Sequence, residues 1–423
     1  AWDFKGLSTN EYTHDLHQYP AKLNPSIARK LIEDYGGDAE NLLDPFCGSG
    51  TTLVEARLAG LDAIGFDINP TAKSMSLAKS QNYDLRRLRS FVMRLDSALD
   101  SMVLMHWQTA VKKSGFGRDE IKTWYPNKSI REIASSIELI RTVDAQYMPN
   151  RKHRLFAMVA LSDCLREVSI QRMSEWKNYR RKGWRDMDIN DLYQDLVPLF
   201  KEKLNANLTS VCSYIDELKM HSNYNSTDVV VDSVNSVNSM KSKFLPKEGI
   251  DLVVTSPPYG DSPTTVAYEQ FSWLSNVWLG FDNRTPGSLG SEMMGGQRKL
   301  FVAPLGQRSI DSAISKMEMS FAMKNYAFYK DYLESIRNVA DIVKVGGHVC
   351  YVVGNRTSGD QYMRLDLFTR WAFEKNGFKR VGEIRNRKLT NTRMPGAIAV
   401  TENGQKKIVP TMKEEFIVVC KKS

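Results

Sequence analysis

A glycine-rich turn between two predicted strands is the feature that most constrains this chain. It lies in "NLLDPFCGSGTTLVEARLAGLDAIGFDINP", residues 41–70. Residues 41–44 predict a short buried strand, residues 51–58 a helix closed by a glycine, and residues 62–66 a second strand. Because a helix connects the two strands, they are expected to lie parallel in one sheet. The segment therefore predicts a βαβ unit with a glycine-rich first turn.

The residues at the ends of these strands are suited to binding a nucleoside. Gly48 and Gly50 allow the backbone to approach a ligand, and the helix that follows presents free N–H groups. Asp67 ends the second strand about 20 residues after the turn begins, where an acid accepts from both ribose hydroxyls. Asp232 ends a third strand in "VVVDSVN", where a carboxylate accepts from an adenine amine; a solvated turn aspartate is the alternative.

Further strand signals alternate with helical stretches along the chain. Residues 227–233, 250–256, 346–355 and 413–422 read as strands. This alternation predicts an α/β fold with a doubly wound, mostly parallel, Rossmann-like sheet.

The stretch between the second and third strands has a different character. Long helix-like segments dominate it, including residues 153–185, so residues 83–225 are interpreted as a large helical insertion. Residues 1–82 and 226–423 then form the sheet domain. Residues 281–320, rich in Gly, Arg and Met, are interpreted as a mobile loop.

Composition narrows the class of protein. The chain has 423 residues, 42% hydrophobic and 25% charged, as in soluble globular proteins. Its five cysteines are scattered without a CxxC pair and its six histidines are dispersed, which argues for a reducing compartment and against a metal site. No apolar run approaches the roughly 20 residues of a membrane helix. The net charge of +9 favours a polyanionic partner.

A proline pair follows the fourth predicted strand, in "VVTSPPYGDS", residues 253–262. Proline cannot donate to a sheet ladder and fixes φ. The segment Ser256-Pro257-Pro258-Tyr259 is therefore expected to leave its strand as a rigid loop that presents a hydroxyl, free carbonyls and an aromatic ring together.

These motifs together resemble a known family. "DPFCGSGTT", "GFDINP" and "TSPPY", preceded by "HQYPAKLNPSIARKL", are similar to the motif set of amino-directed DNA methyltransferases, over residues 12–82 and 226–423. Members transfer a methyl group from S-adenosylmethionine to an exocyclic base nitrogen. The cytosine-N4 type more often carries serine before the PPY sequence.

The resemblance implies a role for each matching position. Catalysis falls to Ser256, Pro257, Pro258 and Tyr259. The residues implied in cofactor binding are His17, Tyr19, Pro20, Lys22, Asp44, Phe46, Gly48, Gly50, Thr51, Asp67, Ile68, Asp232 and Ser233. In the commonest members the target-recognition region lies elsewhere relative to the third-strand motif, whereas here the insertion precedes Asp232.

The implied chemistry acts on an amine whose lone pair is conjugated with the base. The Ser256 hydroxyl and the Pro257 carbonyl accept the amino hydrogens and free the lone pair, while Tyr259 stacks on a base flipped out of duplex DNA. Adenine-N6 methylation, tRNA guanine methylation and a catalytically silent nucleic-acid-binding relative are the alternatives. A cysteine nucleophile is disfavoured because no Pro-Cys dipeptide occurs.

One segment of the insertion combines basic and aromatic residues, as DNA-contacting surfaces do. In "QRMSEWKNYRRKGWR", residues 171–185, the expected DNA contacts are Arg172, Lys177, Arg180, Arg181, Lys182 and Arg185, interleaved with aromatic rings. A solvated basic helix face is the alternative. Arg393, in "NRKLTNTRMPG", is a further expected DNA contact. Double-stranded DNA, and a cognate restriction endonuclease, are the expected partners in a prokaryotic cytoplasm.

Overall fold

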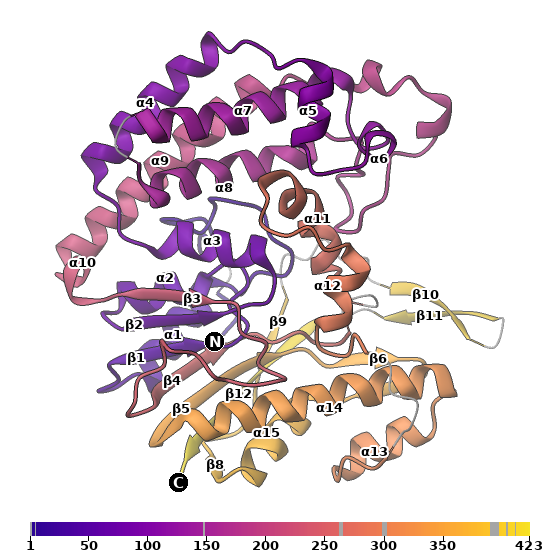
Figure 1. The fold of residues 1–423 in the computed structure, drawn as a ribbon. Helices are drawn as coiled ribbons and strands as arrows, with labels where there is room; N and C mark the ends of the chain where they lie inside the picture. The colour runs from indigo at the N-terminus through magenta and orange to yellow at the C-terminus, as the bar shows by residue number, and fades with distance from the viewer. Residues whose placement is uncertain are drawn as a thin grey trace.

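The computed structural model describes residues 2–4, 6–146, 149–261, 265–297, 303–389, 397–402, 405–410 and 412–423. Its centre is a twisted sheet (Figure 1). The strands of this sheet are β1 (Asn41–Asp44), β2 (Asp62–Phe66), β3 (Val229–Asp232), β4 (Ile250–Thr255), β5 (Val343–Val353), β8 (Phe378–Arg380), β9 (Arg385–Lys388) and β12 (Glu414–Lys422).

The strand order confirms the doubly wound, mostly parallel sheet. Strands run β3-β2-β1-β4-β5-β12-β8, and the first five are mutually parallel. β12 is antiparallel to β5, β8 and β9. Parallel neighbours end at the same edge, so the residues that follow β1, β2 and β4 meet there.

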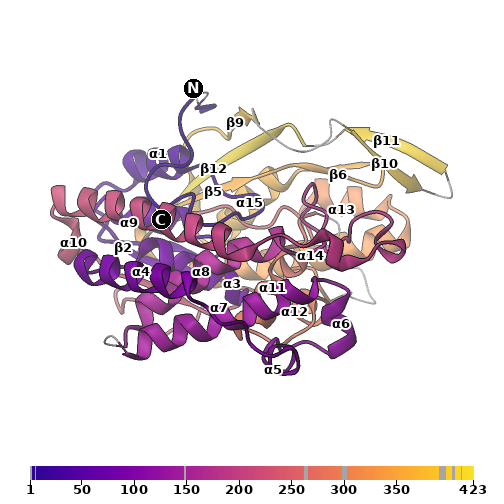
Figure 2. The same cartoon turned by 90° about the horizontal axis from the view of Figure 1, so that it is seen from above.

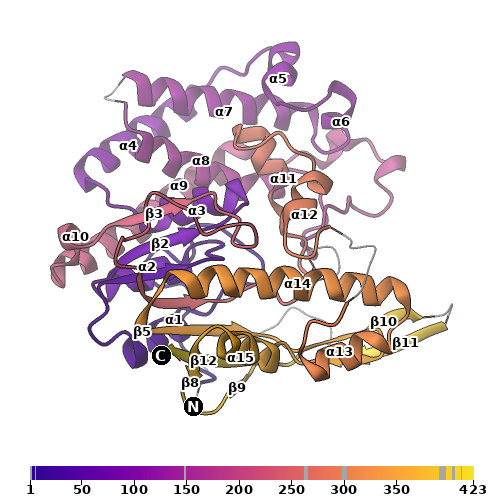
Figure 3. The ribbon, with the colours of Figure 1, turned by 60° about the horizontal axis from the view of Figure 1, so that its bottom comes forward.

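Helices cover both faces of the sheet (Figure 3). They are α1 (Pro25–Tyr35), α2 (Thr51–Leu58), α14 (Met319–Ile342) and α15 (Leu365–Lys375). Side chains alternate along each strand, so successive residues enter two different cores. Leu42 and Leu252 pack with α1 and α2, whereas Leu43 and Val253 pack with α14 and α15. Asn24 caps α1, because its side-chain oxygen accepts from the Ser26 N–H at 2.9 Å.

A block of helices stands over α3 (Pro70–Ser80) on one side of the sheet (Figure 1). It comprises α4 (Leu85–Asp100), α5 (Trp107–Lys113), α6 (Arg118–Lys122), α7 (Asn127–Gln146), α8 (Arg151–Glu167), α9 (Leu196–Met220) and α10 (Asn223–Ser226). Its core continues into α11 (Tyr268–Leu279), whose Trp278 is 2% exposed. The block therefore packs against parts of the chain that lie both before and after β3. That it recognises the DNA target stays a prediction.

The prediction that residues 153–185 are helical is wrong beyond Glu167. α8 ends there; residues 168–183 form an irregular loop with a bridge between Gln171 and Arg180, and a short 3-10 helix, Trp184–Asp186, follows. The Ser169 hydroxyl donates to the Arg166 carbonyl and accepts from the Gln171 N–H, which diverts the backbone from the helix.

The prediction that residues 281–320 form a single loop is also wrong, because this segment contains helices. It contains α12 (Pro286–Glu292), capped by Thr285, and α13 (Arg308–Ser315), capped by Gln307. Both caps accept from backbone N–H groups of the first turn. A separate antiparallel pair, β10 (Ala397–Glu402) and β11 (Gln405–Pro410), lies at the opposite end of the molecule from α10 (Figure 2).

Candidate active site

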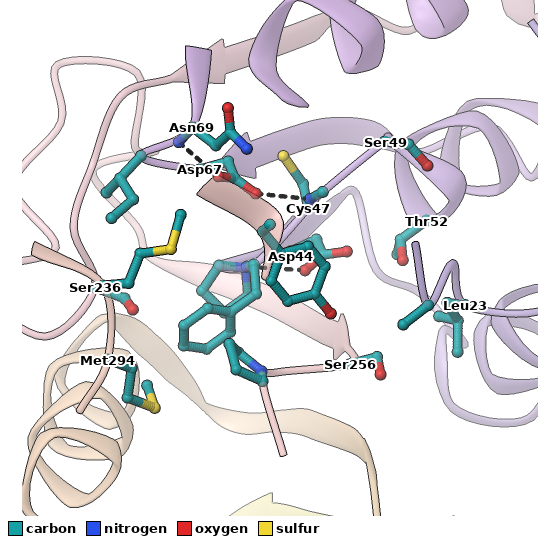
Figure 4. A pocket seen from close by; sticks show the side chains of 18 of the residues that line it. Leu23, Asp44, Cys47, Ser49, Thr52, Asp67, Asn69, Ser236, Ser256 and Met294 are labelled. Atoms are coloured by element: carbon teal, nitrogen blue, oxygen red, sulfur yellow. Dashed lines mark hydrogen bonds between the residues drawn. The ribbon is translucent and has the colours of Figure 1, made fainter. Parts of the chain in front are cut away.

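A pocket opens where β1, β2 and β4 end (Figure 4). The predicted site residues that line it are Tyr19, Lys22, Asp44, Phe46, Gly48, Thr51, Asp67, Ile68, Ser256 and Pro258. Figure 4 shows Leu23 and Thr52 on one side of the cavity and Ser236 and Met294 on the other, with Asp44 between them. The structure therefore brings together the glycine turn and the proline loop, which lie about two hundred residues apart in the sequence.

The glycine turn takes a shape that requires glycine. Gly50 has a φ of 86°, and a Cβ there would lie 2.8 Å from the Cα of Ser76. The Gly48 N–H donates to Asp67 Oδ2 at 3.0 Å. The turn is thus held against the end of β2, and Gly50 supports the pocket from behind rather than lining it.

Asp44 and Asp67 are carboxylates whose ionised forms are disfavoured by burial. Burial raises the pKa of Asp44 to about 6, against hydrogen bonds from Thr255 Oγ1 at 2.6 Å and the Phe46 N–H at 3.1 Å. Burial likewise raises the pKa of Asp67 to about 6, against the N–H groups of Asn69 and Gly48. A positively charged ligand in this pocket would offset that cost.

The N-terminal segment closes one side of the pocket. The Tyr19 ring is stacked on Tyr268, with centroids 5.7 Å apart, and both rings line the cavity. Lys22, the basic residue among the described lining residues, donates to the His14 carbonyl. His17 does not line the pocket: it is 2% exposed, and its Nε2 lies 2.9 Å from Ser162 Oγ of α8. Pro20 is buried beside Tyr19 and is likewise outside the lining.

The third-strand residues lie beside the pocket rather than in its wall. Asp232 accepts from the Ser242 hydroxyl at 2.8 Å, and Ser233 accepts from Lys73 Nζ at 3.2 Å. The wall is formed instead by residues 234–237, which follow directly. The role of Asp232 and Ser233 toward an adenine edge stays a prediction.

The proline loop presents Ser256 to the cavity and turns Tyr259 away from it. Ser256 Oγ lies 2.9 Å from the Tyr259 hydroxyl, which donates to Glu415 Oε1 at 3.0 Å. Arg387 Nε donates to Glu415 Oε2 at 2.8 Å. No sequence motif marks Glu415.

The Tyr259 ring packs against the backbone that follows β5. A Cβ on Gly354 would lie 2.6 Å from Tyr259 Cδ2, so this close approach requires glycine. Pro257 is buried, and Pro258 and Gly260 contribute to the lining where the ring does not. The expected stacking of a base on Tyr259 stays a prediction.

Three lining residues come from segments in which no sequence motif predicts a binding site. Tyr268 begins α11, and Met293 and Met294 follow α12. They face the cavity because the loop after β4 returns to the sheet edge. The aromatic and thioether side chains add an apolar surface to the pocket.

The basic and aromatic segment, residues 171–185, divides into structural and exposed cations. Arg180 lies between Trp124 and Trp184, at 3.8 and 4.7 Å from their ring centroids, and donates to the Thr123 carbonyl at 2.7 Å. Arg172 pairs with Glu175 at 2.7 Å. These two guanidinium groups are engaged within the protein.

The other cations of this segment are more open. Lys182 and Arg185 are exposed, while Arg181 and Lys177 are partly exposed. The segment reaches the pocket side of the molecule because Trp176 packs edge-on against Phe271 of α11, with centroids 5.5 Å apart. Arg393 lies outside the described residues.

Two negative findings concern the described residues. Within them, no group of three or more His, Cys, Asp or Glu side chains is arranged to hold a metal ion. No helix that the structure describes is both long enough and apolar enough to cross a membrane.

Comparisons with known proteins agree with this geometry. Residues 1–78 match the N6/N4 methyltransferase family, described as DNA methylase. The chain is 30% identical over 438 residues to the Type II methyltransferase M.MvaI of Kocuria varians, covering 99% of this chain and 93% of that protein.

Two other similarities are more limited. A tRNA (guanine(10)-N2)-dimethyltransferase of Methanothermobacter thermautotrophicus is 35% identical over 91 residues, which is 20% of this chain and 27% of that protein. Among solved structures, the rRNA methyltransferase aviRa from Streptomyces viridochromogenes aligns at 9% identity, covering 96% of this chain and 88% of that one, with a TM-score of 0.34.

The first prediction concerns the two pocket carboxylates. With a pKa of about 6, each binds its proton more tightly in the folded than in the unfolded chain, so the free protein loses stability as pH rises through 6. A cationic ligand prefers the ionised carboxylates. Affinity for S-adenosylmethionine should be constant above pH 7 and weaken as pH falls below about 6.

Titration calorimetry from pH 5 to 8, in buffers of different ionisation enthalpy, measures the affinity and the released protons. Asp67→Asn is the matched variant: it should weaken binding by about 1.5–3 kcal/mol, the usual worth of a charged hydrogen bond, and flatten the pH dependence. A dissociation constant that does not change between pH 7 and 5 contradicts the assignment.

The second prediction concerns the exposed cations. Replacing Arg181, Lys182 and Arg185 together with Ala should weaken DNA binding and reduce its salt slope by up to about three units, one for each phosphate contact. Fluorescence anisotropy at several salt concentrations measures both quantities. Affinity for S-adenosylmethionine should be unchanged.

The matched control removes the same number of charges elsewhere. Lys375, Lys379 and Lys421 are exposed around β8 and the end of β12 that pairs with the first half of β5, away from the carboxyl strand ends that form the pocket. Their triple Ala variant should keep the wild-type salt slope. Equal salt slopes for the two triple variants would mean that residues 181–185 form a solvated surface that does not contact DNA.

The third prediction separates Arg180 from its neighbours. Arg180→Ala removes two hydrogen bonds to Thr123 and two cation–π contacts, so the free energy of unfolding should fall by about 1–3 kcal/mol. Lys182→Ala, two positions along, should change it by less than about 0.5 kcal/mol. Urea denaturation measures both; equal stability of the two variants would contradict this structural role.

Proposed function

Because the chain belongs to the amino-directed (N6/N4) DNA methyltransferase family, with S-adenosylmethionine as methyl donor, we propose that it methylates the exocyclic amine of cytosine in duplex DNA. The observation that carries the proposal is the position of Ser256. Its hydroxyl faces the same cavity as Asp44 and Asp67, directly after a strand and directly before two prolines. Serine at this point presents a neutral acceptor to an amine.

The residues of the pocket fit S-adenosylmethionine. When bound, this cofactor supplies a methyl group activated by a sulfonium charge. Asp67, at the end of β2, retains lone pairs for ribose hydroxyls beyond those that accept from Gly48 and Asn69. Asp44 and its partner Thr255 lie at the end of β1 and β4, and Ile68 offers an apolar surface for a purine.

The proline loop supports activation of the amine. The Ser256 hydroxyl and the Pro257 carbonyl are hydrogen-bond acceptors, whereas an exocyclic amine is a donor. Accepting both amino hydrogens draws the nitrogen toward tetrahedral geometry and localises its lone pair for attack on the methyl carbon. The rigid loop holds this geometry in advance, so positioning accounts for much of the rate.

Cysteine chemistry is disfavoured by the one thiol in the pocket lining. Cys47 is 5% exposed, and burial raises the pKa of its thiol well above the usual value. Its Sγ contacts Ser76 Oγ at 3.6 Å, as a packing residue does. A neutral thiol is a weak nucleophile.

Two alternatives act on other amines. Adenine-N6 methylation uses the same acceptor pair and the same cofactor, so the family allows either base. Guanine methylation in tRNA is supported by a short similarity that covers 20% of this chain. We favour DNA because the similarity to the Type II DNA enzyme covers 99% of it. A cognate restriction endonuclease and a prokaryotic cytoplasmic location belong to this proposal.

The fourth prediction identifies the product. Incubation with labelled S-adenosylmethionine should label unmethylated duplex DNA and leave tRNA unlabelled. Mass spectrometry of the digested DNA should find N4-methylcytosine, and sequencing of the product locates the recognition site. Finding N6-methyladenine would contradict the cytosine assignment and leave the family intact.

Ser256→Ala tests the loop in the same assay. It should lower the methylation rate by roughly 10²–10³-fold, the scale of losing one positioned polar contact to the transition state. Affinity for S-adenosylmethionine should be retained, because Thr255 still donates to Asp44. Cys47→Ala is the matched control in the same pocket and should keep most of the activity.

A further inference from the structure

A line of hydrogen bonds runs from the pocket to the far side of the proline loop. Ser256 Oγ lies 2.9 Å from the Tyr259 hydroxyl, the Tyr259 hydroxyl is 3.0 Å from Glu415 Oε1, and Arg387 Nε is 2.8 Å from Glu415 Oε2. The last two residues are direct partners across β12 and β9. The side chains of Arg387 and Glu415 are 9% and 15% exposed, so water competes little for these bonds.

The direction of each bond follows from the number of hydrogens available. A carboxylate that accepts from a guanidinium is ionised and has no hydrogen to donate, so Tyr259 is the donor to Glu415. Burial and the Glu415 charge raise the pKa of Tyr259 well above its usual value, so the phenol keeps its hydrogen. A phenol carries one hydrogen, and Glu415 receives it.

The contact between Tyr259 and Ser256 is thereby fixed as well. With the phenol hydrogen engaged, the Tyr259 oxygen can only accept, so Ser256 must donate across the 2.9 Å gap. The single hydrogen of the serine hydroxyl then points away from the pocket. What Ser256 presents to the cavity it lines is a pair of acceptor sites.

We infer that Glu415, held by Arg387, is a positioning residue that acts through Tyr259 to make Ser256 an obligate hydrogen-bond acceptor, so that the pocket selects an amino-bearing base and rejects its keto counterpart. The inference rests on the proposed function and deepens it. Glu415 contacts neither base nor cofactor in this scheme; it sets the polarity of the residue that does.

The consequence for base choice is physical. An amine brings hydrogens to the Ser256 lone pairs, whereas a keto oxygen brings a second acceptor. Turning the serine hydrogen toward a keto oxygen would leave two oxygens 2.9 Å apart with no hydrogen between them. A site built on such a fixed polarity discriminates strongly between donor and acceptor analogues of similar shape.

The fifth prediction replaces Glu415 with Gln. The amide of Gln can donate to Tyr259, which frees the phenol hydrogen for Ser256 and reverses the polarity of both bonds. The single-turnover methylation rate should fall by roughly 10- to 100-fold, with S-adenosylmethionine affinity unchanged and only the fall in melting temperature that the loss of one charged hydrogen bond to Arg387 entails. Glu414→Gln, the neighbouring position on β12, is the matched control and should behave as wild type.

The decisive readout is a ratio of affinities, measured with S-adenosylhomocysteine in place of the methyl donor. Two duplexes differ only at the target position, where the methylated base is replaced by its keto analogue: uracil for cytosine, or hypoxanthine for adenine. Intrinsic duplex differences cancel when the ratio is compared between variants. The amino-over-keto preference should fall by about tenfold or more in Glu415→Gln and stay unchanged in Glu414→Gln.

A double-variant comparison tests whether Glu415 acts through Tyr259. If it does, Tyr259→Phe should lower the same preference, and adding Glu415→Gln to it should cost nothing further. A preference in Glu415→Gln equal to that in Glu414→Gln, or an added loss in the double variant, overturns the inference while wild-type DNA methylation stands. Wild-type protein that leaves DNA unmethylated removes both the proposed function and this inference.

Discussion

A hydrogen bond of 2.6 Å from the Thr255 hydroxyl to the Asp44 carboxylate joins the ends of β4 and β1, and both sides of the pocket depend on it. The two strands are parallel neighbours, with Leu42 opposite Leu252, so their last residues lie at one edge. The glycine turn follows one strand and the proline loop follows the other. Both are therefore held about one strand spacing, roughly 4.8 Å, apart before any ligand binds.

The N-terminal segment is fixed over this edge by buried polar contacts with two different elements. His14 Nε2 lies 2.8 Å from Glu55 of α2, and His17 bonds to Ser162 of α8, next to Asp163. Burial lowers the pKa of His17, which favours the neutral ring. The helical block thus has a role besides any contact with DNA, because it supports the wall that carries Tyr19.

Much of the fold could be predicted from local patterns. Each strand of the parallel part is a short apolar run with a turn residue after it, and helices separate the runs, so the sheet follows from the sequence alone. The turn at Gly48 and Gly50 and the loop at residues 256–259 were identifiable because glycine and proline restrict the backbone in known ways.

What the sequence could not predict depends on contacts between distant residues. Glu415 meets Tyr259 across 156 positions, and nothing local distinguishes it from Glu414. The wall at residues 234–237 is set by how the chain leaves β3, and no motif marks it. Residues 168–185 have a composition typical of helices, yet they do not continue α8. Arg180 instead packs between Trp124 and Trp184, which only the folded chain brings together.

At the end of β4, two successive residues make different contacts. Side chains alternate along a strand, so Thr255 points toward β1 and Asp44 while Ser256 points toward the cavity and Tyr259. In the proposed function, Thr255 therefore maintains the cofactor side of the site, and Ser256 reads the base. In the inferred scheme the polarity of Ser256 is set by Glu415 and Arg387 on β12 and β9, so it can be altered without moving Asp44. On this proposal, cofactor binding and base selection are adjacent in space yet governed by separate hydrogen bonds.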